Sequence, residues 1–109
     1  MIKLDILSDP ICPWCLIGKT NLDNALVQIP DVKIQIEWHP FQLNPEMPLK
    51  GMDRRKYLTT KFGNKENAYR VYSRISKTAT EIGINLELQK IERTPNTLDA
   101  HRLIYWSGF

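Results

Sequence analysis

Cys12 and Cys15 are the only cysteines among the 109 residues, and Pro13 and Trp14 separate them. Two thiols at this spacing can form and break a disulfide reversibly when both lie within one helical turn. The sequence before them alternates like a strand and the sequence after them has a helical pattern, so Cys12 is expected at the start of a helix. Unpaired backbone N–H groups and the helix dipole favour a thiolate there. We therefore expect Cys12 to have a pKa below the ordinary value of about 8.5 and to act as the nucleophile, with Cys15 held inward as the resolving thiol.

The two residues between the cysteines refine this expectation. Pro13 suits the first turn of a helix, because proline forfeits there only a hydrogen bond that would not form. Neither Pro13 nor Trp14 carries an ionisable group, which predicts a milder oxidant than a motif with histidine between its cysteines. Trp14 points out of the helix start in this arrangement, and we expect it to form an exposed apolar lip that binds substrate together with Pro13.

Other uses of the cysteines fit the sequence less well. A zinc site needs four ligands, and the remaining candidates, His39 and His101, lack the paired spacing of a zinc module, so no metal is expected. A permanent disulfide would close too short a loop to remove much unfolded-state entropy. We expect His39 to be a surface or loop-anchoring residue and His101 to be a buried, hydrogen-bonded histidine, neither of them catalytic.

The positioning elements follow from periodicity and from turn residues. A β-α-β order opens the chain, a loop with three prolines between residues 40 and 48 follows, and helices make up the rest. Asp53 and Asn64 are expected helix caps, and Gly63 and Gly83 are expected helix ends. The expected strands cover residues 2–6 and 32–39, and the expected helices cover residues 15–29, 53–62, 64–82 and 97–105.

Composition limits the classes of function. With 42% hydrophobic and 25% charged residues, the chain is typical of one small globular domain at most. The net charge of +3 comes without a basic stripe interleaved with aromatics, so no nucleic-acid partner is expected. No apolar run approaches a membrane span, and the N-terminus does not resemble a secretory signal, which predicts a cytoplasmic protein.

Three motifs in order carry a family resemblance. Residues 8–19, 37–45 and 93–103 resemble the DsbA-like thioredoxin superfamily, specifically its FrnE-like cytoplasmic branch. The resemblance implies an α/β thioredoxin-like fold with an α-helical insertion. It also implies a thiol-disulfide oxidoreductase or isomerase that acts on protein or small-molecule thiols without a bound cofactor. By position, the family's nucleophilic and resolving cysteines fall on Cys12 and Cys15.

Glutathione-dependent relatives supply the main alternative. Kappa-class glutathione transferases and 2-hydroxychromene-2-carboxylate isomerases are similar to this chain, but they have serine at the position of Cys12 and use the sulfur of glutathione. Glutathione is therefore retained as an alternative substrate. The same resemblance places Asn96 and Thr97 in the substrate pocket, although capping of the last helix explains them equally well. A non-enzymatic, chaperone-like binding module is the third alternative.

The resemblance also bears on domain organisation. We expect residues 1–51 to form the N-terminal βαβ part of a thioredoxin-like domain with its proline-rich loop, and residues 52–109 to form the helical insertion. The strands, closing helix and cis-proline loop that complete such a fold are not found in this sequence, so we expect the chain to be the N-terminal half of a longer protein. Apolar surface left exposed would be covered by that segment, by a partner or by a second copy in a homo-oligomer.

Overall fold

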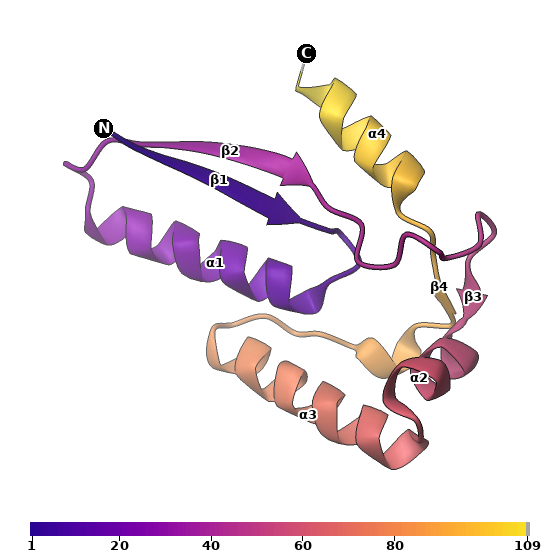
Figure 1. Cartoon of the computed structure of the whole chain (residues 1–109). Coiled ribbons are helices and arrows are strands. Elements are labelled where there is room, and N and C mark those ends of the chain that lie inside the picture. The colour runs from indigo at the N-terminus through magenta and orange to yellow at the C-terminus, as the bar shows by residue number, and fades with distance from the viewer. Residues whose placement is uncertain (109) are drawn as a thin grey trace. The chain divides into compact units, whose positions relative to one another are not determined.

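The computed structural model describes residues 1–108 and contains four helices, four strands and one 3₁₀ turn (Figure 1). In chain order these are β1 (Ile2–Ser8), α1 (Pro13–Gln28), β2 (Ile34–Pro40), β3 (Met52–Asp53), α2 (Arg54–Phe62), α3 (Lys65–Glu81), η1 (Leu88–Lys90), β4 (Arg93–Thr94) and α4 (Leu98–Ser107). They form two compact units. The first unit comprises Met1–Leu43 and the segment from Thr97 onward, and the second comprises Asn44–Asn96.

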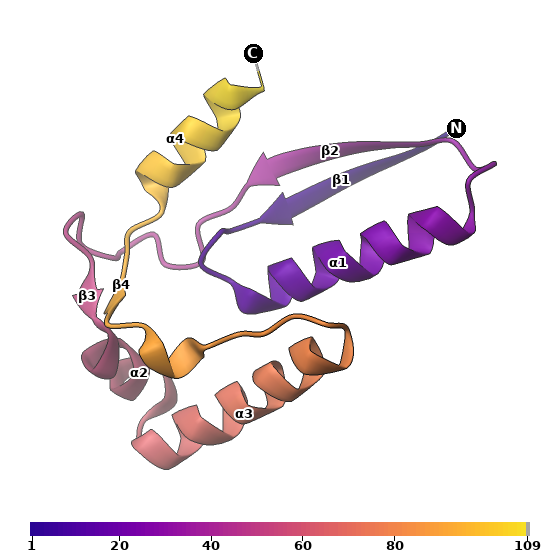
Figure 2. The ribbon, with the colours of Figure 1, turned by 180° about the vertical axis from the view of Figure 1, so that it is seen from behind.

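A parallel strand pair organises the first unit. β1 and β2 pair in register from Ile2 opposite Ile34 to Ser8 opposite Pro40, and α1 connects them in the chain. Figures 1 and 2 show α1 running along one face of this pair. Ile17 on α1 is only 3% exposed, which marks the packed side of that helix.

The expected β-α-β start is confirmed in type and order. The bounds differ from the expected ones by one or two residues, as at the start of β2, where the strand begins at Ile34 and not at Val32. The backbone N–H of Val32 donates to the carbonyl of Ile29, so Val32 belongs to the turn that follows α1.

Two capped helices dominate the second unit. The Asp53 side chain accepts a hydrogen bond from the backbone N–H of Lys56 at the start of α2, and the Asn64 side chain accepts from Asn67 at the start of α3. Gly63 ends α2 with a φ of 87°, a left-handed conformation that glycine adopts without strain. Ala68, Ile75 and Ala79 on α3 are buried, as the periodicity predicts.

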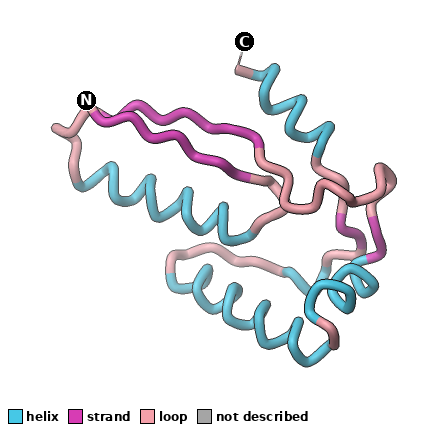
Figure 3. The backbone as a smooth tube through the Cα atoms, viewed as in Figure 1, coloured by secondary structure: helices cyan, strands magenta, loops and turns pink. Residues whose placement is uncertain are grey.

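A short antiparallel strand pair in the second unit was not expected from the sequence (Figure 3). Met52 of β3 pairs with Thr94 of β4, and Asp53 pairs with Arg93. Nearby, the Asn96 side chain donates to the carbonyl of Met47 at 2.7 Å. These contacts join the two ends of the segment that contains α2 and α3.

The compact units therefore differ from the division at residues 51 and 52 expected from the sequence. The last helix, α4, groups with the parallel strands and not with the helical segment. One side chain supports this grouping, because His101 of α4 contacts Asp9 after β1 and the carbonyl of Phe41 after β2.

Candidate active site

The two thiols lie where β1 passes into α1. Cys12 is the N-cap of the helix, and Pro13 occupies its first turn. The backbone N–H of Cys12 donates to the carbonyl of Asp9 at 3.0 Å, and the N–H of Cys15 donates to the carbonyl of Cys12 at 3.1 Å. Both thiols are free and half-buried. The expected position of the dithiol at a helix start is confirmed, whereas Cys15 is no more enclosed than Cys12.

The charge of this dithiol differs from the expectation. Burial raises the pKa of the Cys12 thiol, and its hydrogen bond with Cys15 adds to that rise. Burial also opposes the thiolate of Cys15, but hydrogen bonds from the Asp9 backbone, Cys12 and the Ser8 side chain together lower the pKa of Cys15. The expected lowering of the Cys12 pKa was therefore wrong. The two thiols titrate together, and the first negative charge to form is favoured on the Cys15 sulfur.

Ser8 is a residue that the sequence analysis missed. As the last residue of β1 it reads only as a strand end before a turn. Its hydrogen bond to Cys15 depends on how that turn folds back onto the first helical turn.

Asp9 connects the dithiol loop to the rest of the first unit. It is 1% exposed, and its carboxylate accepts hydrogen bonds from the backbone N–H of Leu43 at 2.8 Å and of Ile11 at 3.4 Å. His101 Nε2 lies 3.3 Å from the same carboxylate. The negative charge of Asp9 also opposes a thiolate on Cys15, so this residue influences the charge of the dithiol.

The environment of His101 fits the expected buried, hydrogen-bonded histidine. The residue is 8% exposed, and its Nε2 lies 3.1 Å from the carbonyl of Phe41 as well as 3.3 Å from Asp9. Both neighbours are hydrogen-bond acceptors, so we assign the proton to Nε2. His101 thereby joins the loop before α1, the segment after β2 and helix α4.

The remaining residues near the dithiol are only partly engaged. Trp14 is 44% exposed, as required of an apolar lip, and Pro13 is half-buried. Lys19 forms an exposed ion pair with Asp23 at 2.7 Å, one turn further along α1. No contact with a sulfur is found for Lys19 within residues 1–108, so the structure gives it no tuning role.

Asn96 and Thr97 occupy the junction before α4. The Asn96 side chain is bonded to the Met47 carbonyl, and the buried Thr97 is the N-cap residue of α4 without a capping bond from its side chain. A part in substrate binding stays a prediction for both residues.

One further cluster has metal-ligand chemistry. Ligand atoms of Asp5, Glu37 and His39 lie within 4.8 Å of one another on the exposed surface of the parallel strands. Lys3 already supplies a positive charge there, with its amine 3.4 Å from Glu37 and 3.8 Å from Asp5. His39 lies 3.2 Å from Asp5 and so has the surface role expected of it.

A parallel β-α-β arrangement that presents two free thiols at the start of its helix defines a thioredoxin-like protein. A family model described as the DSBA-like thioredoxin domain matches residues 3–108, and the chain belongs to this family. The α/β thioredoxin-like fold expected from the three motifs is therefore confirmed.

Individual relatives agree with this assignment. The chain is similar to a crystal structure of the probable DsbA oxidoreductase SCO1869 from Streptomyces coelicolor, with a TM-score of 0.85 and 25% identity over 99% of this chain and 47% of that one. It is also 24% identical over 96 residues to the uncharacterized protein YwbO of Bacillus subtilis (strain 168), which covers 88% of this chain and 42% of YwbO. The chain thus spans less than half the length of these relatives.

Proposed function

We propose that this chain carries the redox centre of a thiol-disulfide oxidoreductase. The observation that carries the proposal is the pair of free thiols that share hydrogen bonds at the start of α1. Family membership supports the same chemistry, since the structural relative is described as a probable DsbA oxidoreductase.

The proposed reaction proceeds by two exchanges. In the starting state Cys15 carries the negative charge; the Cys12 proton passes to the Cys15 thiolate along their hydrogen bond, and the resulting Cys12 thiolate attacks one sulfur of a substrate disulfide. A mixed disulfide forms, and the other substrate sulfur leaves as a thiolate. Cys15 gives its proton to the substrate thiolate that has left, and the Cys15 thiolate then attacks the sulfur of Cys12 and releases the second substrate sulfur as a thiolate. The protein dithiol is oxidised by two electrons, and the substrate disulfide is reduced by two. The reverse sequence oxidises a substrate dithiol.

Cys12 is assigned as the attacking sulfur despite its raised pKa, because the nucleophilic cysteine of the family falls on this position. Trp14 beside it leaves apolar surface exposed, which favours contact with an apolar disulfide or polypeptide. A cytoplasmic location and the identity of the substrate thiols remain predictions from the sequence.

Trapping of the mixed disulfide tests the proposal. Cys15→Ser should accumulate a covalent complex with a disulfide substrate through Cys12, whereas Cys12→Ser should accumulate none. Non-reducing gels and mass spectrometry would identify the linked sulfur. A complex that forms only in Cys12→Ser would reverse the roles of the two cysteines.

The alternatives give other results in the same experiment. A glutathione-dependent enzyme would bind glutathione and keep its activity in Cys15→Ser. A binding module would show two ordinary thiols and no exchange above that of free cysteine in solution, which would refute the proposed function.

A further inference from the structure

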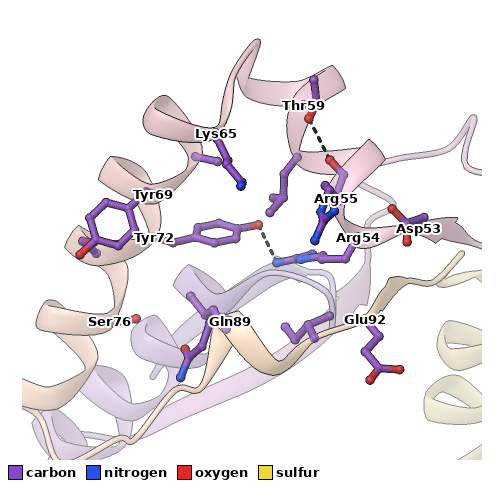
Figure 4. A pocket seen from close by; sticks show the side chains of 15 residues that line it. Asp53, Arg54, Arg55, Thr59, Lys65, Tyr69, Tyr72, Ser76, Gln89 and Glu92 are labelled. Carbon is purple, nitrogen blue, oxygen red and sulfur yellow. Dashed lines mark hydrogen bonds between the residues drawn. The ribbon is translucent and has the colours of Figure 1, made fainter.

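The second unit contains a groove that no step of the dithiol chemistry uses. It has a volume of about 820 Å³ and lies between α2, α3 and the segment around η1 (Figure 4). This volume is in the range of sites that bind small ligands or short peptide stretches. Its apolar lining comes mainly from Leu58, Ala68, Tyr72, Leu88 and Ile91.

The polar groups of the groove are unequally distributed. In Figure 4 the nitrogen atoms of Arg54, Arg55 and Lys65 converge on the middle of the groove, while the carboxylates of Asp53 and Glu92 lie at its margin. Asp53 is already engaged as the cap of α2. The cationic side chains therefore set the charge that a ligand would meet.

Arg54 is a half-buried cation without a carboxylate partner. Its guanidinium donates to the Tyr72 hydroxyl at 2.6 Å and to the Thr94 hydroxyl at 2.9 Å, and it lies over the rings of Tyr57 and Tyr72. Its Nε is buried and has no hydrogen-bond partner among the residues that the structure describes. Burial raises the pKa of Tyr72 although the charge of Arg54 opposes the rise, so the phenol stays neutral at pH 7 and does not compensate the guanidinium.

Arg55 and Lys65 add to this uncompensated charge. Across residues 1–108 neither side chain forms an ion pair, and neither does Arg54. An apolar floor beside three unpaired cations is complementary to a ligand that combines apolar side chains with carboxylates.

We propose that this groove binds a short stretch of unfolded polypeptide that carries apolar side chains next to acidic ones. The inference rests on the proposed function and narrows its substrate class to polypeptides, with the second unit holding substrate through contacts that do not involve sulfur. The open form of the groove between two helices and an extended segment suits a chain that passes through it.

Binding of cysteine-free peptides tests the inference without thiol exchange. Two fluorescent peptides share leucine and phenylalanine residues, but one carries two glutamates and the other two lysines. We expect the intact chain to bind the acidic peptide roughly five- to tenfold more tightly at low salt, as two partly screened charge pairs would give. The difference should shrink as the salt concentration rises.

Charge reversal locates the site. Arg55→Glu with Lys65→Glu should remove or invert the preference for the acidic peptide, because both side chains are exposed and neither forms an ion pair among the described residues. Arg70→Glu with Arg74→Glu changes the charge equally on α3 outside the groove and should leave the preference intact. When the acidic peptide is added to the intact chain, the backbone amide signals that shift in a ¹⁵N spectrum should be those of residues that line the groove.

Three results would overturn the inference. They are equal affinity for both peptides, an unchanged preference in the Arg55 and Lys65 variant, or groove amides that shift with protein concentration alone, which would identify a second copy as the occupant. Reduction of a small aromatic disulfide is measured in parallel. If the intact chain binds the acidic peptide but does not reduce the aromatic disulfide, the result contradicts the proposed function and leaves the inference about the groove standing.

Discussion

The charge of the dithiol is set by a few donors around Cys15. The Ser8 side chain, the Asp9 backbone and Cys12 all donate toward that sulfur and offset the cost of its burial. Cys12 has no comparable excess of donors, and burial dominates there. The helix start still matters, because hydrogen bonds from the backbone of Trp14 and Cys15 lower the pKa of Cys12, but they are outweighed.

Removal of the Ser8 hydroxyl should therefore change the titration of Cys15. In Ser8→Ala the Cys15 thiolate loses a donor, so its pKa rises and less thiolate is present at pH 7. Alkylation of Cys15 by iodoacetamide, followed by mass spectrometry across pH, should slow at neutral pH and converge with the parent rate at high pH. Ser107→Ala is the control, since that hydroxyl donates to the Ile104 carbonyl on α4. An unchanged pH profile in Ser8→Ala would exclude this role.

The buried Asp9–His101 pair is expected to stabilise the first unit. Asp9→Ala leaves the Leu43 N–H without its acceptor and His101 Nε2 with the Phe41 carbonyl alone, which should lower the free energy of unfolding by about 3 kcal/mol. Asp5→Ala breaks a similar carboxylate–histidine contact that is exposed, with His39, and should cost less than about 1 kcal/mol. Urea unfolding of both variants measures the difference. Equal losses would contradict a special role for the buried pair.

For individual residues, the sequence predicts which side chains are reactive better than it predicts which side chains they contact. The spacing of Cys12 and Cys15 predicts a dithiol, and the strand pattern before it and the helix pattern after it place that dithiol at a helix start. Two partners of the Asp9 carboxylate, Leu43 and His101, are 34 and 92 residues away from it, and no local pattern indicates such contacts. The pKa order of the cysteines depends on donors such as Ser8, whose orientation is a tertiary property.

Among the elements, the short β3–β4 pair depends on one glycine. Gly51 has a φ of 79°, and a Cβ there would lie 2.7 Å from the Thr94 carbonyl oxygen. Gly63 has a similar φ of 87°, but a Cβ there would meet nothing within 4 Å. A residue with a Cβ would be strained at both positions, but only at Gly51 would it also clash with a neighbouring atom.

Alanine at these two glycines should separate the two effects. Gly63→Ala should lower the free energy of unfolding by about 1 kcal/mol, the cost of a left-handed residue. Gly51→Ala carries the same cost and also a clash with β4, so its loss should be clearly larger. Urea unfolding followed by circular dichroism measures both, and similar losses would show that the backbone at Gly51 relaxes.

The short strands β3 and β4 were not predicted from the sequence because each has only two residues. Long elements such as α3 repeat their pattern over several turns, and their caps, Asn64 among them, are visible in the sequence. A strand of two residues has no period to detect. The assignment of α4 to the first unit likewise depends on His101, which a helical pattern alone does not place.

Over the whole molecule, apolar side chains are exposed on α4. Leu103 is 73% and Trp106 is 67% exposed, and Trp106 borders a hollow of about 390 Å³ that also involves His101. Among the helices of residues 1–108, none has the length and apolar character required to cross a membrane. The exposed apolar side chains of α4 favour association with another protein surface.

We expect the chain alone to self-associate through α4. Leu103→Lys should shift the sedimentation equilibrium toward monomer, whereas Val27→Lys, at an equally exposed position on α1, should not. If both variants behave as the parent does, α4 is not the contact.

The strand pair β3–β4 closes the base of residues 44–96, so this segment begins and ends at almost the same place. An inserted segment of this kind can change in length or sequence during evolution without disrupting the first unit, because the two points where it leaves and rejoins the rest of the chain stay close together. The redox centre and the peptide groove would then diversify separately within one polypeptide.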